Sequence, residues 1–421
     1  MTSIVKQRIE QIRHGNVPEG YQKTRAGIIP SDWTSFSIGD LYTERKDPGV
    51  PSLPILTVSI HSGVSDGALD DEEIGKKVKR IEDKTQYRTA RAGDLVFNMM
   101  RAWQGAIGVV RQDGLVSPAY IVATPNPAIC PPFMDYYMKT PQMINRLHRK
   151  SYGVTDFRLR LYWDSFASVE CALPPLDEQK KIAEILSTQD KLIALKEKLI
   201  EEKKRQKKAL MQQLLTGKKR LSGFKGKWRD EKLGNLANMN SGGTPDSSLE
   251  KNYGNDYIWI SISDMSASRK YVYSSEKGLS KCGYMNSSAK LYPAGTVLFA
   301  MYASVGECSI AANECCSSQA ILGIETGEEL NNEYLYYFLL DGRERFKKLS
   351  QASSQPNLNK KIVQNITIDF PDLAEQEEIT VVLSTIDKEI DYLYKNLDQE
   401  KQKKKALMQL LLTGIVRVQP C

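Results

Sequence analysis

The sequence predicts an α+β fold: two mixed α/β domains separated by two long helices that pair as an antiparallel coiled coil, in a pseudo-twofold circular repeat. Three observations predict this fold. The block 178–217 recurs at 375–414, each copy has the pattern of one long helix, and the segments that precede the two copies resemble each other more faintly. Such internal repeats determine architecture because each copy is expected to form the same structural unit.

The repeated block aligns without a gap. Glu178 corresponds to Glu375, and the same offset of 197 residues holds as far as Gly217 and Gly414. About half of the positions are identical, and both copies end in Leu-Leu-Thr-Gly. Glycine at the end of a helical pattern is a common stop signal, so one helix is predicted to end near each of these glycines.

Each copy is expected to start with a capped helix. Prolines end the preceding strands, and Asp177 or Asp372 offers a side-chain oxygen to the first free amides. The second copy has apolar residues at alternating spacings of four and three, the pattern of a coiled-coil seam. These are Ile379, Leu383, Ile386, Ile390, Leu393 and Leu397. The first copy has a wider stripe, made of Ile182, Ile185, Leu186, Leu192, Ile193, Leu199 and Ile200.

The intervening segments also correspond. "RAGDLVFNMM" at Arg91 matches "PAGTVLFAMY" at Pro293, and the pair 136–137 matches the pair 336–337 as Tyr-Tyr. The segment 8–15 resembles 210–217, so the N-terminal helix looks like the end of a third copy. The expected parts are therefore an N-terminal helix that packs with the second long helix (1–15), a first domain (16–176), a central helix (177–221), a second domain (222–373) and a C-terminal helix (374–421).

The composition is that of an ordinary globular protein. The 421 residues are 41% hydrophobic and 26% charged, and the net charge of +7 permits a nucleic-acid partner without requiring one. No run of about 18 apolar residues predicts a membrane span, and the N-terminal segment lacks the apolar stretch of a signal peptide, so we expect a cytoplasmic protein. Seven irregularly spaced cysteines fit a reducing compartment, and no metal site is expected.

The motifs of catalysis are incomplete. An amino-methyltransferase needs Asn or Asp before Pro-Pro-aromatic, whereas this chain has Cys130 before Pro-Pro-Phe. "LTGKKR" at Leu215 lacks the first glycine and the Ser/Thr of a phosphate-binding loop. Two Glu-x-Lys triplets, at Glu82 and Glu178, lack the upstream acidic partner that nucleases use. The sequence therefore indicates a protein that is not an enzyme.

Basic residues are distributed over both domains. Lys and Arg neutralise phosphates, and Arg, Asn and Gln can read base edges in the major groove. For any one basic residue, a solvated surface position is the simpler interpretation. The interpretation as a DNA-binding surface depends on the architecture, because two basic domains on one long helix pair suit a two-part DNA site. The candidates on this ground are Lys76, Lys77, Lys79, Arg80, Arg88, Arg269 and Lys361.

The chain resembles the specificity (S) subunits of type I restriction–modification systems over essentially its whole length. The resemblance rests on "LPPLDEQKKIAEIL" and "DLAEQEEITVVLSTID" at the start of the long helices and on "KKALMQQLLTGKKRL" at the end of the first. "AGIIPSDW", "GDLVFNMMRAWQGAIG", "NSGGTPDS" and "QPNLNKKIVQNI" in the domains are similar to that family as well. One departure is "FPDLAEQ" in place of the fuller Leu-Pro-Pro start in the second copy.

The resemblance implies a function for each part. Each domain would be a target recognition domain that reads one half of a split, asymmetric site in double-stranded DNA, the half-sites being about 10 bp apart. The spacer helices would set the gap and dock two methyltransferase (M) subunits, and restriction (R) subunits would complete the complex. S-adenosylmethionine, ATP and Mg would belong to these partners, and this chain would bind no cofactor.

The candidate base-reading residues come from loops that match between the domains. They are Arg101, Gln104, Arg158 and Arg160 in the first domain and Thr244, Tyr302, Gln319, Asn357 and Lys360 in the second. Gly105 and Gly306 are expected to allow tight turns in these loops. The candidate partner-binding residues of the spacers are Glu178, Gln179, Ile182, Leu186, Asp190, Glu375, Gln376, Ile379, Leu383 and Asp387.

Two other interpretations stay open at this stage. A coiled-coil scaffold whose paired domains bind protein would have the same repeat, and binding of duplex DNA by the assembled complex would distinguish it from a DNA reader. A self-sufficient methyltransferase or nuclease is disfavoured by the missing motifs, and methylation by this chain alone would support it.

Overall fold

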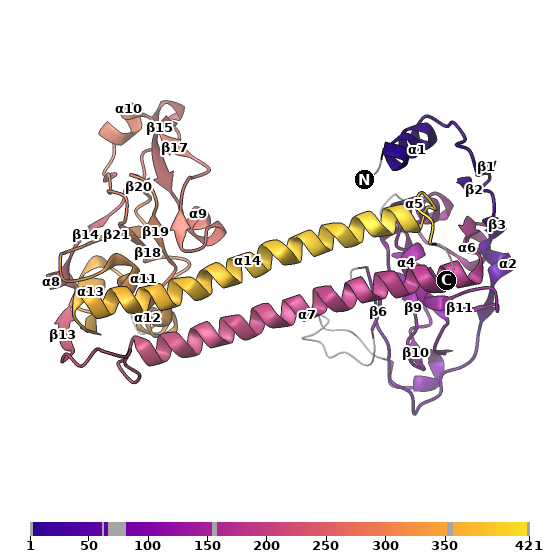
Figure 1. Cartoon of the computed structure of the whole chain (residues 1–421), viewed down its shortest axis with the longest axis horizontal. Coiled ribbons are helices and arrows are strands. Elements are labelled where there is room, and N and C mark those ends of the chain that lie inside the picture. Colours follow the sequence, from indigo (N-terminus) through magenta and orange to yellow (C-terminus); the bar gives the residue numbers. More distant parts are fainter. Residues whose placement is uncertain (1–2, 61–62, 66–80, 154–157, 352–356, 419–421) are drawn as a thin grey trace. The chain divides into compact units, whose positions relative to one another are not determined.

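The computed structural model describes residues 3–60, 63–65, 81–153, 158–351 and 357–418 (Figure 1). The chain forms two compact units: unit 1 is Met1–Lys196 with Asn396–Cys421, and unit 2 is Glu197–Lys395. Two 39-residue helices, α7 (Leu176–Leu214) and α14 (Leu373–Leu411), contribute one part to each unit. Among the described helices, none has the length and apolar character that crossing a membrane requires.

Unit 1 is built on a four-stranded antiparallel sheet with the order β4-β11-β8-β9. Strand β8 is buried on both faces, and its first three residues, Leu-Val-Phe before Asn98, are apolar. Short two-stranded pairs, β1-β2, β3-β12, β5-β6 and β7-β10, surround this sheet. The strands are β1 (Tyr21–Thr24), β2 (Gly27–Pro30), β3 (Thr34–Ser37), β4 (Tyr42–Arg45), β5 (Val58–Ser59), β6 (Gly63–Val64), β7 (Arg88–Ala90), β8 (Leu95–Asn98), β9 (Ile107–Val109), β10 (Gly114–Val116), β11 (Tyr120–Pro125) and β12 (Glu170–Leu173).

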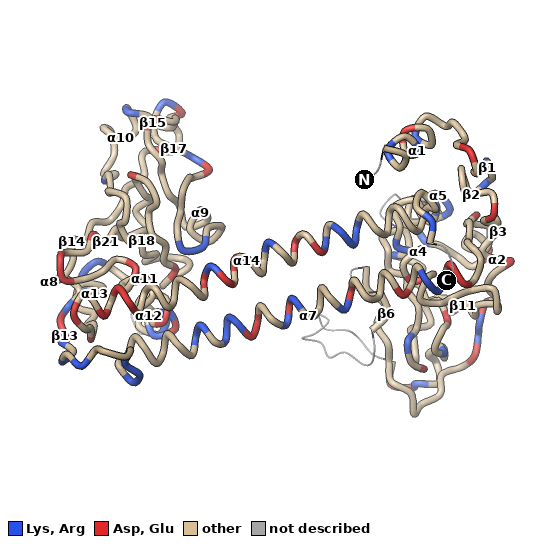
Figure 2. Tube along the Cα trace, viewed as in Figure 1, with Lys and Arg blue, Asp and Glu red and all other residues tan. Residues whose placement is uncertain are grey.

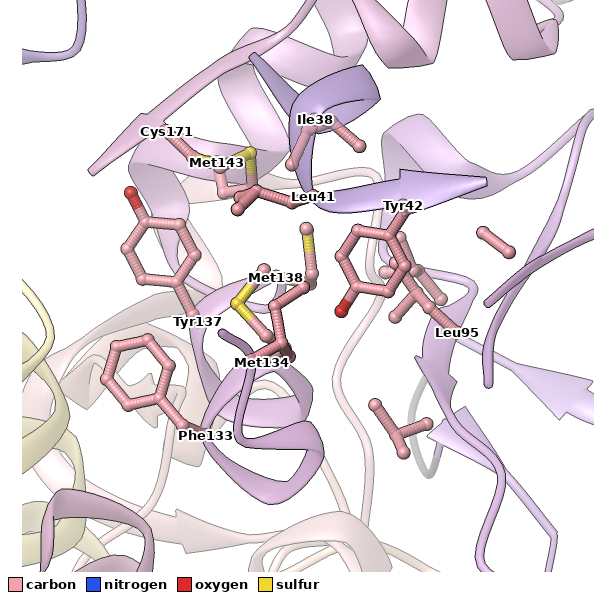
Figure 3. Close-up of a cluster of buried hydrophobic side chains, with 14 of the residues drawn as sticks. Ile38, Leu41, Tyr42, Leu95, Phe133, Met134, Tyr137, Met138, Met143 and Cys171 are labelled. Atoms are coloured by element: carbon pink, nitrogen blue, oxygen red, sulfur yellow. The ribbon is translucent and has the colours of Figure 1, made fainter. Parts of the chain in front are cut away.

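The helices of unit 1 close its core over this sheet. Pro131 and Pro141 stand in the first turns of α4 and α5, where a missing N–H costs nothing, and Thr140 caps α5 by accepting from Met143 N. Figure 3 shows side chains of α2, α4 and β8 meeting in the core, where Leu41, Met134 and Leu95 are fully buried. The helices are α1 (Ser3–Arg13), α2 (Ile38–Leu41), α4 (Pro131–Tyr137), α5 (Pro141–Lys150) and α6 (Trp163–Ala167), with 3₁₀ turns η1 (Lys84–Gln86) and η2 (Ala102–Gln104).

Unit 2 repeats this plan and adds to it. Its sheet has the order β14-β21-β18-β19-β16, in which the first four strands repeat the order of unit 1 and β16 is added parallel to β19. Strands β17, β15 and β20 form a separate three-stranded sheet. The strands are β13 (Arg229–Lys232), β14 (Ala237–Ser241), β15 (Tyr253–Ile260), β16 (Tyr271–Val272), β17 (Gly278–Leu279), β18 (Val297–Ala300), β19 (Cys308–Ala311), β20 (Cys316–Ser317), β21 (Ile321–Thr326) and β22 (Thr367–Phe370).

The helices of unit 2 also follow unit 1. α8, α11, α12 and α13 stand at the places in the chain order that α2, α4, α5 and α6 have in unit 1, whereas α9 and α10 belong to the added part. Asn331 and Asn359 cap α11 and α13 through their side-chain oxygens. The helices are α8 (Leu233–Leu236), α9 (Ile262–Ala267), α10 (Lys281–Met285), α11 (Asn332–Asp341), α12 (Arg343–Gln351) and α13 (Lys360–Gln364), with the 3₁₀ turn η3 (Glu250–Asn252).

Inside each unit, α7 and α14 pack antiparallel through equivalent ion pairs. In unit 1, Lys404 Nζ lies 2.6 Å from Asp190 Oδ1, and in unit 2, Lys207 Nζ lies 2.6 Å from Asp387 Oδ1. Both partners of the second pair differ from those of the first by the offset of 197. Figure 2 shows that acidic and basic residues are interspersed along both helices.

Each of these aspartates also accepts a tyrosine hydroxyl. Tyr136 OH donates to Asp190 and Tyr337 OH to Asp387, both at 2.7 Å. Tyr136 therefore corresponds to Tyr337, one residue away from the match of the Tyr-Tyr pairs expected from sequence. The sequence match was misleading because Phe338 stands where unit 1 has Tyr137, so the identical Tyr-Tyr pairs are displaced by one residue between the two helices.

The seam of the first copy differs from its predicted stripe. Leu192 and Leu199 are 37% and 40% exposed, so these two expected seam residues are wrong, whereas Ile182, Leu186 and Ile200 are buried. The buried positions follow those of the second copy at the offset of 197. Positions 189 and 196 in α7 are therefore equivalent to the seam residues 386 and 393 in α14.

Polar residues occupy those two positions in the first copy. Gln189, 6% exposed, donates from Nε2 to Glu400 Oε2 at 2.7 Å, and Lys196 Nζ lies 4.0 Å from Glu400 Oε1. The second copy has Ile386 and Leu393 there instead. Polar residues in an otherwise apolar seam favour one register of the two helices. Here it is the register in which Gln189 and Lys196 meet Glu400, since any other register leaves them unpaired.

The starts of the two helices differ by a single cap. Asp372 Oδ1 accepts from Glu375 N at 3.0 Å, as expected for the second copy. The first helix starts at Leu176, which places Asp177 inside its first turn, so the prediction of Asp177 as the cap was wrong. Gly217 and Gly414 follow the helix ends with φ of +67° and +70°, the left-handed conformation that ends a helix.

A buried carboxylate at each helix start connects the helix to its unit. Glu178 is 3% exposed and accepts from Arg417 Nε at 2.9 Å, from Arg417 Nη2 at 2.7 Å and from Trp33 Nε1 at 3.3 Å. In unit 2, Glu375 accepts from Arg220 Nε and Nη2, both at 2.6 Å. The hydrogen bonds that Arg417 donates to the Glu178 carboxylate raise the pKa of Arg417, so this arginine stays charged.

The neighbouring glutamines attach the same helix starts to backbone. Gln179 Oε1 accepts from Cys130 N at 2.9 Å, and Gln376 Oε1 accepts from Asn331 N at 2.8 Å. Each glutamine also donates from Nε2 to two carbonyl oxygens, one of them that of the proline two residues before the helix, Pro174 or Pro371. Because both side chains are buried and fully used, α7 and α14 have a fixed position within their units.

The N-terminal helix contacts the segment that follows α14. Arg8 Nη1 donates to Ile415 O at 2.5 Å, and Tyr21 OH donates to Gly414 O at 2.6 Å. The helix itself has no buried residue, so these hydrogen bonds and the ring contact of Arg8 with Tyr21, at 5.2 Å, position it.

We expect the substitution Arg417→Met to destabilise unit 1 by about 3 kcal/mol, because it leaves the buried Glu178 carboxylate without a charged partner, with the neutral donors Trp33 Nε1 and Val418 N alone. Urea unfolding followed by circular dichroism measures this free energy. Arg25→Met is the control, since Arg25 is 87% exposed and lies 3.8 Å from Glu170, and it should change the free energy by less than about 1 kcal/mol. Equal effects of the two substitutions would contradict the assigned role of Arg417.

Candidate nucleic-acid interface

One end of the central sheet gathers most of the candidate base-reading residues of each unit. The loop between β8 and β9 in unit 1 and the loop between β18 and β19 in unit 2 start with Met99 and Met301. Met99 O accepts from Leu161 N at 2.8 Å, and Met301 O accepts from Leu358 N at 3.0 Å. Both leucines are fully buried, so the residue before each is held beside the loop.

A second backbone hydrogen bond adds another segment to the same place. Met99 N donates to Ala119 O at 3.4 Å, and Met301 N donates to Ala320 O at 2.9 Å. The sheet end thus joins three chain segments in each unit: the loop, the start of β11 or β21, and the segment before α6 or α13. Both units build this arrangement from residues that are far apart in sequence.

In unit 1 the four candidates line one hollow of about 570 Å³. Its lining has Arg101, Gln104, Arg158 and Arg160 with the apolar groups Ile60, Met100, Trp103 and Leu159. None of these lining residues is acidic. Arg101, Arg158 and Arg160 are exposed and form no ion pair within the described part of the chain. Three guanidinium groups without a carboxylate partner make this hollow suited to an anion or to hydrogen-bond acceptors.

The aromatic wall of the hollow is fixed in place. Trp103 Nε1 donates to Met100 O at 3.0 Å, and its ring lies 5.4 Å from that of His148. The turn η2 ends at Gly105, whose φ of +104° any other residue would adopt only with strain. Met100, 47% exposed, stands at the rim. Sequence reasoning missed Met100 and Trp103 because it searched these loops for polar groups.

Unit 2 has neutral polar side chains at the equivalent end of its sheet. Thr244 Oγ1 is hydrogen-bonded to Gln319 Oε1, and both residues are exposed. Gln319 immediately precedes Ala320, which accepts from Met301. Tyr302 and Asn357 are half-buried and lie next to the residues of the Met301–Leu358 hydrogen bond.

The loop of unit 2 also contains the one positive φ of a non-glycine residue in the described part of the chain. Ala303 has φ of +54° and follows Tyr302 directly. Gly306, with φ of +82°, closes the turn as Gly105 does in unit 1. A non-glycine residue in this conformation is mildly strained, and such strain is found where a loop shape is needed for function.

Other candidates lie elsewhere. Lys76, Lys77, Lys79 and Arg80 fall outside the described residues. Arg88 is half-buried, 3.4 Å from Glu44, and Arg269 is paired with Asp391 and stacked on Tyr394 at 4.6 Å, so both are already used within the chain. Lys360 starts α13, and Lys361 lines a separate hollow of about 600 Å³ with Arg345, Leu349, Asn359, Ile362, Asn365, Ile366 and Thr367.

The ten spacer candidates all make contacts within their own units. Ile182, Leu186, Ile379 and Leu383 are core residues of their units, and the remaining six are the carboxylates and amides already described. Their side chains make contacts within this chain, and their binding to a partner subunit stays a prediction. Arg220 and Arg417, the anchor arginines that pair with Glu375 and Glu178, were missed. They lie three residues after the glycines that end the repeated block and differ by the same offset of 197, so a longer alignment would have found them.

A family model matches this chain twice. The model of the type I restriction modification DNA specificity domain matches residues 30–205 and 225–400, so each match includes one sheet and most of one long helix. A curated relative, the type I restriction enzyme MjaVIII specificity subunit of Methanocaldococcus jannaschii, is 25% identical over 422 residues, which span 95% of this chain and 96% of that protein.

Two solved structures share the fold. One, from a study of complex assembly and conformational transition of the type I R-M system, has a TM-score of 0.61 at 22% identity and covers 92% of this chain and 99% of that one. The other, the type I restriction-modification system S subunit from M. genitalium, has a TM-score of 0.55 at 14% identity and covers 90% and 96%. This chain belongs to the family of type I restriction–modification specificity subunits, non-catalytic proteins with two DNA-recognition domains.

Proposed function

We propose that this chain reads a bipartite, asymmetric site in double-stranded DNA, with one half-site for each unit. The observation that carries the proposal is the equivalent sheet end in the two units. The same backbone hydrogen bonds build it, but arginines line it in unit 1 and neutral polar groups in unit 2. Equivalent scaffolds with different side chains suit two different half-sequences.

Adenine methylation belongs to the partner subunits in this proposal. Two methyltransferase subunits carry S-adenosylmethionine, and restriction subunits carry ATP and Mg, while this chain selects the sequence. The test is to co-express the chain with the methyltransferase subunit encoded beside it and to map N6-methyladenine across the host genome. A split, asymmetric motif that requires this chain is the expected result. An assembled complex that yields no new motif would instead favour the scaffold that binds protein.

The paired helices are proposed to set the gap between the half-sites. Support comes from α7 and α14, each of which runs without interruption through residues of both units. Their helix starts are fixed by buried groups and their register by polar pairs, so length added to both helices has no flexible segment to absorb it.

We expect a four-residue insertion in both helices, after Lys196 and after Lys395, to lengthen the gap by about one to two base pairs, since it adds about 6 Å of helix. Both half-sequences should stay the same. Methylome mapping of the variant measures both quantities. The same four residues inserted between Arg25 and Ala26 serve as the control and should leave the gap unchanged. A changed half-sequence in the lengthened variant would count against this role of the helices.

Two exposed apolar side chains mark equivalent positions for the two methyltransferase subunits. Leu195 of α7 and Tyr392 of α14 are 65% and 66% exposed and differ by the offset of 197. Large apolar groups at the outer face of a helix are unfavourable in water and are common where a partner covers them. We propose that each contacts one methyltransferase subunit, in equivalent surroundings.

We therefore expect Leu195→Glu and Tyr392→Glu each to weaken the binding of one methyltransferase subunit by about tenfold or more, because each buries a charge in an apolar contact. Mass photometry of the assembled complex should show one methyltransferase subunit where the unsubstituted chain holds two. Tyr273→Glu is a matched control, because Tyr273 is also 66% exposed but lies outside both helices. Full assembly of either helix variant would contradict the proposed contacts.

A further inference from the structure

Arg160 and Asn357 occupy equivalent positions in the two units. Each directly precedes the buried leucine whose N–H donates to the methionine carbonyl of the loop, at 2.8 Å in unit 1 and 3.0 Å in unit 2. They differ by the offset of 197 that relates the two long helices, and each is soon followed by a short helix, α6 or α13. The backbone hydrogen bond beside the loop is therefore equivalent for the two residues, and Arg160 also pairs with Tyr152 in a short antiparallel bridge.

The chemistry of the two side chains differs in a way that DNA can distinguish. A guanidinium has donors alone, and it matches the two acceptors, O6 and N7, that guanine presents in the major groove. A carboxamide has both a donor and an acceptor, and it matches N7 and the N6 amino group of adenine.

The surroundings strengthen this difference. Arg160 lies with Arg101, Arg158 and Gln104 in a hollow whose lining has no carboxylate, and such a site favours a base edge rich in acceptors. Asn357 lies next to the loop of Tyr302, where the polar side chains described above are neutral. Arg343 packs on Gly306 of this loop but is paired with Glu307. Within the described residues, neither the Arg160 nor the Asn357 side chain forms a hydrogen bond to another group. Both are free to bind a ligand.

We propose that Arg160 reads a guanine in the half-site of unit 1 and that Asn357 reads an adenine at the equivalent position in the half-site of unit 2. This inference rests on the proposed function and adds the base class that each unit selects. Arg160 and Asn357 are specificity-determining residues in this proposal, and Trp103 with Met100 forms the apolar wall beside the guanine.

The first experiment maps methylation for the chain co-expressed with its methyltransferase subunit, in three variants. Arg160→Asn should change one guanine of one half-site to adenine and leave the other half-site unaltered. Asn357→Arg should change one adenine of the other half-site to guanine. Arg25→Asn, a substitution at a site 87% exposed and away from the hollow, should leave the motif unchanged.

A second experiment remains informative if Arg160→Asn methylates no DNA. The assembled complex is titrated with duplexes in which each guanine of the half-site is replaced in turn by 7-deazaguanine, which lacks the N7 acceptor. One replacement should weaken binding about tenfold or more for the unsubstituted chain. The complex with Arg160→Ala should bind that duplex and the unmodified one equally well.

The outcomes separate this inference from the proposed function. No split motif for the unsubstituted chain overturns the proposed function itself. A split motif without guanine in the half-site of unit 1, or equal sensitivity of the unsubstituted chain and Arg160→Ala to every 7-deazaguanine, overturns the inference and leaves the proposed function in place.

Discussion

The buried carboxylate at the start of each long helix is the interaction on which the rest of the structure depends. Glu178 is held by Arg417 and Trp33, and Glu375 by Arg220. A carboxylate removed from water is costly unless it is paired, so each helix start is stable only when its arginine is in place. Because the arginine of unit 1 follows α14 in sequence, the pair also joins the end of one helix to the start of the other.

Some parts of the two units are repeated almost unchanged, and other parts differ. The anchors, the tyrosine–aspartate–lysine contacts and the four-stranded sheets are repeated with little change. The seam is asymmetric, with Gln189 and Lys196 in α7 where α14 has Ile386 and Leu393. The sheet ends are asymmetric as well. The repeated parts are thus common to the two units, while the varied parts supply one helix register and two chemically different sheet ends.

The fold was predictable from sequence because repetition and helical periodicity are properties of the chain itself. The same offset of 197 aligned the long helices and would have revealed Arg220 and Arg417. Tyr136 was matched to the wrong tyrosine, since the identical Tyr-Tyr pairs are displaced by one residue and sequence identity alone favours the wrong alignment. Leu192 and Leu199 were wrongly assigned to the buried stripe because a leucine can stand at a buried or at an exposed position of a long helix. Gln189 is polar, so its position in the true seam was not recognised from sequence.

The candidate site was predictable in part. Arg101, Gln104, Arg158 and Arg160 were chosen from separate loops, and the structure brings them to one hollow. Arg88 and Arg269 could not be excluded from sequence, because their acidic partners Glu44 and Asp391 come from distant segments. Whether a basic residue is free depends on tertiary contacts, which composition and spacing do not determine.

Unit 1 consists of two segments that unit 2 separates in the sequence, and this has a consequence for synthesis on the ribosome. Unit 2 is one continuous segment, and its anchor pair joins residues 155 apart, so the pair can form once that segment has emerged. Glu178 must instead wait for Arg417, 239 residues later. The first domain to be translated is therefore the last to be completed, and its carboxylate stays in water until the second half of the chain returns to it.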